Sequence, residues 1–373
     1  MASRRSTPSL SATLIVRDEA AVLPRCLTSI RDLVDEIVVV DTGSTDDSPR
    51  IAADFGARVV ASRWQNDFAV ARNTALAHAR GTWILYIDAD ESAQPLARDA
   101  LMSHLSDPGL VASTVRFRPR TGLTRYREYR LFRNDPRIRF ANVIHETMVP
   151  DLFAVMHADH LAIGKSELAI DHFGYDGNQD AKHRRNIPLL RERLARDPGH
   201  VYSWNHLGHA LAGIGDTDGA LAAWRRAVDV VRTRGVTSSL DRLPYGSLLL
   251  DPHAAAAHPG LLDEALERFG DDHLFHWLQG RRLLAGGRLE EAIALFEDLI
   301  AIEAEALCDD AGMAYDARIF GLFSHEALAL CHFRLERYAD SARYYALAHA
   351  ADPLNPAHQI KQRLAEARGV RNR

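Results

Sequence analysis

The first part of the chain, from Leu10 to Asp90, alternates short apolar runs with longer stretches of helical spacing. Apolar runs of this kind, bounded by polar residues, are typical of strands that are buried on both faces. The runs are Ala12–Val16, Glu36–Val40, Ala57–Ala61 and Trp83–Ile87. Because parallel strands require long crossover connections, the alternation predicts βαβ units. We therefore expect an α/β domain whose mostly parallel, Rossmann-like sheet is covered by helices.

Beyond about residue 180 the strand pattern ends, and alanine, leucine and arginine recur at helical spacing. Three sets of positions match the internal offsets of a tetratricopeptide unit, in which two antiparallel helices pack through small and aromatic residues. The first set is Trp204, Leu207, Gly208, Ala220, Trp224 and Ala227. The second is Gly280, Gly287, Leu289, Ala292 and Phe296, and the third and weaker set is Ala329, Tyr338, Tyr345, Ala348 and Pro353. The spacing predicts an all-α, tetratricopeptide-like repeat domain.

The length of 373 residues exceeds one ordinary domain, since domains commonly span about 100–200 residues. The changes of pattern along the chain place the boundaries. We predict a flexible N-terminus over 1–9, the α/β domain over 10–180, the helical repeat domain over 181–362 and a basic tail over 363–373.

Composition narrows the class of protein. Hydrophobic residues make up 47% and charged residues 25%, which is the balance of a globular protein. The formal net charge of −5 gives no reason to expect a nucleic-acid partner. The polar start lacks the apolar core of a secretion signal, and no run is apolar over the roughly 18 residues of a membrane span. Because the three cysteines also lack the spacing of a zinc or redox site, we expect a soluble, cytoplasmic protein.

Acidic residues follow three of the predicted strands. Asp18 and Glu19 follow the first, Asp41 follows the second, and Asp88 and Asp90 follow the fourth. Ligands of parallel sheets bind beyond the carboxyl ends of the strands, so this edge is the expected functional edge. Asp88 and Asp90 face the same side of an extended segment, because residues i and i+2 face alike. Paired carboxylates suit Mg²⁺ or Mn²⁺, and such an ion could neutralise a diphosphate leaving group.

Four segments around these acidic residues occur together and in order. They are Leu14–Glu19, Val39–Asp46, Trp64–Asn73 and Gly81–Glu91, and together they closely resemble family 2 glycosyltransferases of the GT-A fold. The resemblance continues through Tyr129–Arg133, His145–Glu146, Asp171–Tyr175 and Arg184–Leu190. It covers roughly the first half of the chain. The set of motifs is far more specific than any one of them.

The resemblance implies a site for a nucleotide-sugar donor. Asp41 is expected to face the base or ribose of the nucleotide, with Arg17 and Glu19 in the loop around it. Arg72 lies on a predicted helix that begins near Asp67, which we also assign to the substrate site. A guanidinium fork suits phosphate oxygens, so Arg72 is expected to bind the phosphates of the donor.

The resemblance also implies a metal site and a general base. Asp88 is expected near the ribose and the metal, Asp90 is expected to bind Mn²⁺ or Mg²⁺ directly, and His172 resembles a further ligand. An inverting transfer needs a base that accepts the proton of the acceptor. Many relatives place an acidic dipeptide where this chain has His145 and Glu146, so Glu146 is the candidate and the assignment stays open between the two residues.

The motifs together predict a metal-dependent, inverting glycosyltransferase with a nucleotide diphosphate donor, UDP-sugar by resemblance. The repeat domain fits a peptide or protein acceptor modified on Ser, Thr or Cys, because repeat arrays offer grooves to peptides. Alternatively, the repeats mediate a homodimer and the acceptor is a lipid-linked or polysaccharide glycan. A different class of protein also stays open, namely a peptide-binding scaffold with an inactive glycosyltransferase-like domain.

One motif resembles an unrelated enzyme. Val38–Thr45 reads like the active-site loop of an aspartic protease, but that chemistry needs two such aspartates on an all-β scaffold. The sequence contains no second Asp-Thr-Gly, and the crossovers on either side of this loop are helical in pattern. The same loop lacks the lysine of a P-loop and the glycine spacing of a dinucleotide fingerprint. Neither a protease nor an ATPase or dehydrogenase is favoured.

Overall fold

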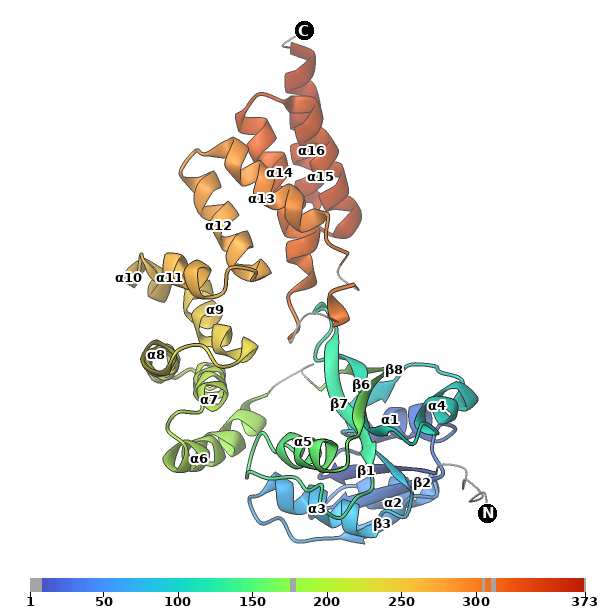
Figure 1. Ribbon diagram of the computed structural model, residues 1–373. Coiled ribbons are helices and arrows are strands. Elements are labelled where there is room, and N and C mark those ends of the chain that lie inside the picture. The colour runs from blue at the N-terminus through green and yellow to red at the C-terminus, as the bar shows by residue number, and fades with distance from the viewer. Residues whose placement is uncertain (1–8, 175–178, 304–305, 310–312, 372–373) are drawn as a thin grey trace. The chain divides into compact units, whose positions relative to one another are not determined.

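The chain forms two compact units in the computed structural model, which describes residues 9–174, 179–303, 306–309 and 313–371 (Figure 1). The first unit consists of Met1–Thr121 and Tyr126–Ala220, and the second consists of Gly122–Arg125 and Leu221–Arg373. Several predicted features lie outside the described residues. They are residues 1–8 of the N-terminal segment, Tyr175 of the Asp171–Tyr175 motif and residues 372–373 of the basic tail.

The first unit is built on an eight-stranded sheet in the order β3-β2-β1-β4-β7-β6-β8-β5. The strands are β1 Leu10–Val16, β2 Glu36–Asp41, β3 Arg58–Ala61, β4 Trp83–Tyr86, β5 Glu91–Ala93, β6 Leu110–Arg118, β7 Tyr126–Arg133 and β8 Ala162–His172. Strand β1 pairs in parallel with β2 and β4, and β2 pairs in parallel with β3. The four predicted strands and their parallel order are therefore confirmed.

The other half of the sheet is mixed. Strand β7 runs antiparallel to both β4 and β6, while β8 runs parallel to β6 and antiparallel to β5. The sequence pattern predicted no strands in this half. The α/β class is confirmed, with a mixed sheet in place of one that continues in parallel.

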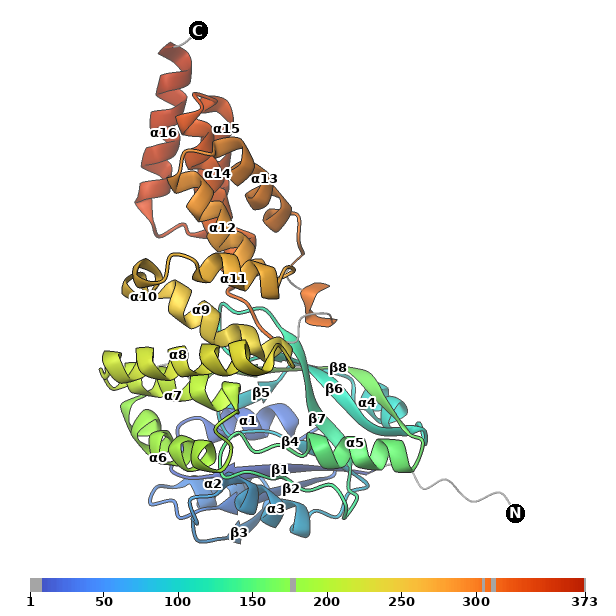
Figure 2. The ribbon, with the colours of Figure 1, turned by 60° about the vertical axis from the view of Figure 1, so that its left-hand side comes forward.

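Helices cover both faces of the sheet (Figure 1). The helices of the first unit are α1 Leu23–Ile30, α2 Ser48–Asp54, α3 Phe68–His78, α4 Arg98–Leu105, α5 Val149–Ala158, α6 Asp180–Arg196 and α7 Val201–Gly213. Helices α1 and α4 pack in the same core cluster as β1 and β4, whereas α3 and α5 contribute to clusters on the opposite face. Helices α6 and α7 run side by side (Figure 2).

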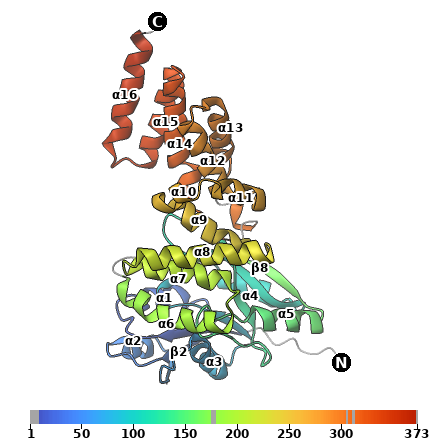
Figure 3. The same ribbon diagram turned by 90° about the vertical axis from the view of Figure 1, so that its left-hand side faces the viewer.

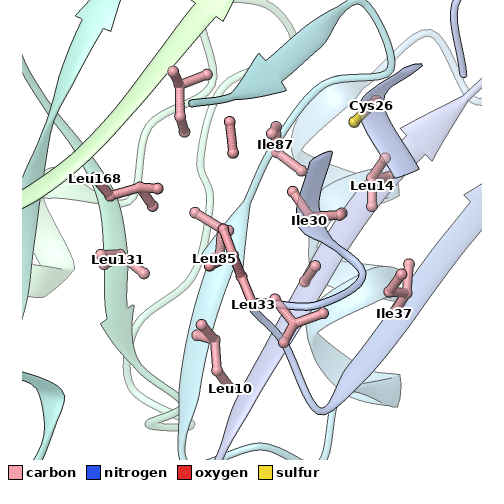
Figure 4. Close-up of a cluster of buried hydrophobic side chains, with 14 of the residues drawn as sticks. Leu10, Leu14, Cys26, Ile30, Leu33, Ile37, Leu85, Ile87, Leu131 and Leu168 are labelled. Carbon is pink, nitrogen blue, oxygen red and sulfur yellow. The ribbon is translucent and has the colours of Figure 1, made fainter. Parts of the chain in front are cut away.

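The larger core lies between the sheet and helix α1 (Figure 4). In β1 the side chains of Leu10 and Leu14 enter this core, while Ile15 packs on the other face, as the period of two in a strand requires. Helix α1 buries Leu23, Cys26, Leu27 and Ile30, whose spacing of three and four residues lines one face of a helix. Burial on both faces explains the continuous apolar runs of the first strands.

The second unit is helical (Figure 3). Its helices are α8 Thr217–Arg234, which begins in the first unit, α9 Leu243–Leu250, α10 Pro252–Ala257, α11 Leu261–Arg268, α12 His273–Ala285, α13 Leu289–Ile300, α14 Leu322–Arg334, α15 Tyr338–Ala351 and α16 Pro356–Arg371. Short 3₁₀ segments occur at Ser239–Arg242, Ala306–Asp309 and Ala317–Phe320. Each of α12 to α15 packs against the next helix in the chain, as stacked repeats do.

Small residues allow the helices of the repeats to approach closely. A Cβ atom at Gly280 of α12 would lie 2.8 Å from two ring atoms of Phe296 in α13. In the next pair, the hydroxyl of Ser341 in α15 donates to the carbonyl oxygen of Ala329 in α14 at 2.9 Å. Both contacts involve predicted repeat positions.

A short segment from between two strands belongs to the second unit. Residues 122–125 connect β6 to β7, yet Thr124 N donates to the carbonyl oxygen of Tyr315 at 2.8 Å. Ala317 N donates to the carbonyl oxygen of Gly122 at 2.9 Å, and Leu123 bridges to Asp316. The second unit thus contains a small β-type pairing within its helices.

The described residues contain no helix that is both long and apolar enough to cross a membrane. The change from strand to helix occurs between His172 and Asp180, whereas the spatial division follows Ala220. Helix α16 extends through the described part of the predicted basic tail. The predicted domain ranges stay predictions.

Replacing Gly280 by alanine is expected to destabilise the second unit. The new methyl group would overlap the ring of Phe296, and overpacking of a closed core typically costs about 1–3 kcal/mol. Chemical denaturation followed by circular dichroism measures this loss. Gly260→Ala is the matched control, because a Cβ at Gly260 meets nothing within 4 Å. Equal stability of the two variants would contradict the close packing of α12 on α13.

Candidate functional site

A cavity of about 850 Å³ lies in the first unit, beside the carboxyl ends of β1 and β4. The segments that line it come from these strand ends, from the loop before α5, from the end of β8 and from α6. Most of the residues predicted for the site line this cavity. They are Arg17, Glu19, Arg72, Asp88, Asp90, His145, Glu146 and His172.

Two predicted residues are not among those that line the cavity. Asp41 ends β2, and its carboxylate accepts a hydrogen bond from the backbone of Ser44 at 3.1 Å. Asp67 caps the N-terminus of α3 by accepting from Val70 N at 3.1 Å. Each carboxylate satisfies backbone donors that would otherwise lack partners. Thr42, the neighbour of Asp41, does line the cavity.

Arg72 connects two carboxylates of the cavity. Its Nη2 donates to Asp88 at 2.8 Å, and its Nε donates to Glu146 at 2.6 Å. The guanidinium lies over the Tyr86 ring, 4.9 Å from its centroid, and only 8% of the residue is exposed. Burial raises the pKa of Asp88, but the positive charges of Arg72 and Arg130 outweigh it and lower this pKa to about 2. Asp88 is therefore ionised at neutral pH.

Asp90 and His172 face one another. The Nε2 atom of His172 lies 3.1 Å from a carboxylate oxygen of Asp90, and its Nδ1 lies 2.9 Å from the carbonyl oxygen of Pro119. Because a carbonyl only accepts, Nδ1 must carry the proton in this contact. The pairing of β5 with β8 sets Glu91 opposite His172, which brings the preceding Asp90 beside the imidazole. Burial lowers the pKa of His172, but the hydrogen bond to Asp90 and the charge of that carboxylate outweigh it and raise this pKa. Nε2 of protonated His172 therefore donates to Asp90, and loss of that proton would leave the Nε2 lone pair facing the same space.

These two side chains fit one edge of a divalent metal site. Two ligands of an octahedral Mg²⁺ with bonds of about 2.1 Å lie about 3 Å apart, close to the separation of Asp90 and His172. A carbonyl that fixes the ring tautomer is a common second partner of a metal-binding histidine. Asp88, the third predicted ligand, pairs with Arg72 instead. Within the described ranges, no group of three or more His, Cys, Asp or Glu side chains is arranged to hold a metal ion.

Gly174 allows Asp90 to occupy its position. A Cβ atom at this glycine would lie 1.7 Å from the Oδ2 atom of Asp90, which is far inside van der Waals contact. The Phe173 N–H also donates to the carbonyl oxygen of Asp90 at 2.9 Å. The end of β8 thus holds the Asp90 loop through both backbone and side chain. The glycine is required by a close approach and not by its dihedral angles.

A buried ion pair supports the loop that carries Asp88 and Asp90. Arg130 of β7 donates to Glu91 at 2.8 Å, and both residues are almost fully buried. The other Glu91 oxygen accepts from the backbone N–H of Asp88 at 2.9 Å. Arg130 is 4% exposed and is not among the residues that line the cavity. Glu91 was not predicted as a site residue, although it continues the same acidic run.

Helix α6 supplies two cations that the sequence analysis did not predict. Lys182 and Arg185 line the cavity, and the Nζ atom of Lys182 lies 3.9 Å from Asp90. They face Glu19, whose pKa is raised to about 7 by burial and by the nearby charge of Asp90. Both cations lie beyond the predicted domain boundary at residue 180. Their sequence context, a helix rich in arginine, is typical of an exposed surface.

His145 and Glu146 point to different surroundings. His145 has a positive φ of 53°, and its ring packs 4.8 Å from the Tyr202 ring and 4.5 Å from the His206 ring. Burial, with the charges of His200 and Arg193, lowers the pKa of His145 to about 3. It is therefore neutral at physiological pH. Glu146 instead turns toward Arg72 and the acidic loop.

Comparison with protein families identifies the parts of the chain. Residues 11–162 match the model of glycosyl transferase family 2, and residues 252–306 match a tetratricopeptide repeat. The chain therefore combines a family 2 glycosyltransferase domain with a helical region that contains tetratricopeptide repeats. The resemblance inferred from the motifs is confirmed.

The similar proteins include a TPR repeat-containing protein of Synechococcus elongatus, which is 40% identical over 220 residues, 57% of this chain and 54% of that protein. The SPbeta prophage-derived glycosyltransferase SunS of Bacillus subtilis is 30% identical over 211 residues, 52% of this chain and 47% of that protein. The chain thus spans about half the length of these curated relatives.

Among solved structures, the chain is similar to glucosyl-3-phosphoglycerate synthase from Mycobacterium tuberculosis in complex with Mn²⁺, UDP and glucosyl-3-phosphoglycerate. The TM-score is 0.37 at 21% identity, over 51% of this chain and 80% of that chain. It is also similar to residues 1–349 of S. aureus TarS, with a TM-score of 0.35 at 15% identity, over 70% of this chain and 92% of that chain.

Replacing Arg72 by methionine is expected to lower the free energy of unfolding by about 3 kcal/mol, because two carboxylates of a largely buried site would lose their shared cation. Urea denaturation at neutral pH measures the change. Arg50→Met is the matched control, since exposed Arg50 also pairs with two carboxylates, Asp47 and Asp54, and is expected to change stability little. Comparable losses in both variants would refute a special role for burial at Arg72.

Proposed function

We propose that this protein is an inverting glycosyltransferase that moves a sugar from a nucleotide diphosphate donor, UDP-sugar, to an acceptor. One observation carries the proposal, namely that a single cavity of about 850 Å³ gathers the predicted residues of three distant motifs. Asp88 and Asp90, Glu146, and His172 come from separate parts of the chain and line the same space. The family 2 domain that contains most of them supports the same chemistry.

Asp90 and His172 would hold the divalent metal, Mn²⁺ or Mg²⁺. An oxygen and an imidazole nitrogen suit Mn²⁺, and their separation fits adjacent ligands of one ion. Such an ion supplies positive charge to the diphosphate as it leaves the sugar. Carboxylate oxygens alone would suit Mg²⁺ better, so the imidazole favours Mn²⁺.

The phosphates of the donor are proposed to lie near Lys182 and Arg185. These cations project from α6 into the same cavity, and Arg17 lines it from the end of β1. Arg72 was expected to bind the phosphates, but its guanidinium already bridges Asp88 and Glu146. We therefore assign Arg72 to positioning these two carboxylates. Glu19 and Asp41 remain the proposed contacts to the nucleoside. Asp67, at the start of α3, also remains a proposed substrate-binding residue.

Glu146 is the proposed general base. Its carboxylate lines the cavity and is oriented by a charge-assisted hydrogen bond from Arg72. The alternative base, His145, packs its ring between aromatic side chains of α7. Glu146 would take the proton from the acceptor as the acceptor attacks the anomeric carbon opposite the leaving diphosphate.

The acceptor is proposed to be a peptide or protein modified on Ser, Thr or Cys. The support is the helical unit, since stacked tetratricopeptide repeats commonly bind peptides. A glycan acceptor with a homodimer formed through the repeats is the alternative. We also propose a cytoplasmic location, for which the scattered free cysteines are the support.

Titration calorimetry with UDP tests the donor and metal assignments together. We expect the wild-type chain to bind UDP with Mn²⁺ present and to bind much more weakly after chelation. Asp90→Asn should remove the metal dependence, and Gly174→Ala should weaken it because the new methyl group displaces Asp90. Gly199→Ala is the matched control, with only ordinary contact at its Cβ. Absence of nucleotide binding under all conditions would favour the inactive scaffold.

Kinetics of two variants decide between the candidate bases. With a UDP-sugar that the wild type turns over, Glu146→Gln is expected to reduce UDP release by about 10²-fold or more while retaining UDP affinity. His145→Asn is compared under the same conditions, with circular dichroism to verify folding. A larger loss of turnover in a folded His145→Asn variant would transfer the role of base to His145.

A further inference from the structure

A second cavity of about 500 Å³ adjoins the first within the same unit. The two cavities share part of their lining, which consists of Ile144, His145, Gln179, Lys182 and Asn186. The shared wall contains the residue next to Glu146. A molecule in the second cavity would therefore lie beside the loop that carries the proposed base.

The charges of the two cavities differ. The first cavity is lined by acidic and basic side chains, including Asp88, Asp90 and Glu146. The second contains Arg120 and Lys182, and its described lining includes no aspartate or glutamate. Four imidazoles complete its polar surface, from His145, His183, His206 and His209. This concentration of hydrogen-bond donors and positive charge favours an anion.

The imidazoles are held in place by the packing of α6 on α7. The ring of His183 in α6 lies against the backbone of Gly213 in α7, where a Cβ atom would approach the ring to 2.4 Å. His206 packs on the His145 ring at 4.5 Å, and His209 lies one turn further along the same helix. The Nε2 atom of His145 is buried and has no hydrogen-bond partner among the described residues. The cavity is therefore built by side chains that packing holds in place.

We propose that the second cavity binds an anionic group, a phosphate or a carboxylate, that the acceptor carries near the atom that receives the sugar. The role in acceptor binding rests on the proposed glycosyl transfer, whereas anion binding itself does not. A peptide acceptor would supply the anion as an acidic or phosphorylated residue beside its Ser, Thr or Cys.

Neutral imidazoles suit this function. Burial lowers the pKa values of His145, His206 and His209, and neighbouring histidines lower them further, so these rings are uncharged without a ligand. A neutral imidazole donates one N–H, and Arg120 adds a charged donor at the end of a flexible chain. Lys182 lies in the wall that the two cavities share. The site therefore binds an anion without first accumulating mutually repelling charges.

A metal ion is a less suitable occupant. Although four histidines surround this cavity, no three metal-ligating side chains in the described part of the chain converge on one point. The His145, Tyr202 and His206 rings instead pack on one another in tilted and edge-to-face contacts. The cavity thus offers separate donors around its wall and not a coordination sphere.

Titration calorimetry of inorganic phosphate into the full chain tests the anion site. Saturating UDP and Mg²⁺ fill the first cavity, and the titration is repeated without them. We expect saturable binding that His183→Gln and Arg120→Gln each weaken about 10-fold, as expected for loss of a hydrogen bond to a charged group. Arg120 is exposed, so its replacement remains informative if His183→Gln fails to fold. Exposed His157 of α5 provides the control, since His157→Gln should bind phosphate like the wild type.

Arg185→Gln separates the two cavities, because Arg185 lines only the first. Phosphate binding that Arg185→Gln weakens and Arg120→Gln does not would place the ion in the first cavity and overturn the proposal. Absence of saturable binding would overturn it as well. If UDP does not bind, only the proposed donor is refuted. The phosphate titration without UDP still measures binding to the anion site. Acetate titrated in parallel then distinguishes a carboxylate site from a phosphate site.

Discussion

The ion pairs of Arg72 with Asp88 and Glu146 are the interaction on which the arrangement of the site depends. They join α3, the end of β4 and the loop before α5, three segments that are distant along the chain. One buried cation between two carboxylates leaves a net negative charge, which is costly to keep away from water. Lys182 and Arg185 of α6 bring positive charge to the same cavity, and the proposed metal ion would add to it.

Strands that can be recognised from their own residues alone could be predicted from the sequence. β1, β2 and β4 are buried on both faces, so their apolar runs and the acidic residues at their ends are visible without any partner. By contrast, β7 and β8 bury Arg130 and Asp171, whose buried partner Glu91 and half-buried partner Arg118 come from other strands. An apolar pattern does not reveal strands whose buried positions are occupied by ion pairs.

The candidate site shows the same division. Asp90, His172 and Glu146 were predicted because they lie in recognisable motifs, and the structure brings them to one cavity. The contribution of Lys182 and His206 could not be predicted, since it depends on α6 and α7 packing beside the loop of His145. Arg185 lies in the Arg184–Leu190 motif, but the motif gave it no role. Arg72 lines the same cavity as Asp88 and Glu146, but its ion pairs with them are tertiary contacts that spacing does not encode.

The loop between β6 and β7 has a consequence for how such a protein could change during evolution. Residues 122–125 take part in the fold of the second unit through Tyr315 and Ala317, so the chain passes between the units at more than one point. A helical array appended by simple fusion at one end could be exchanged for another with a single crossover in the gene. Here a replacement array would also have to supply a pairing partner for that loop. Sequence changes in one unit therefore constrain the changes that the other unit can accept.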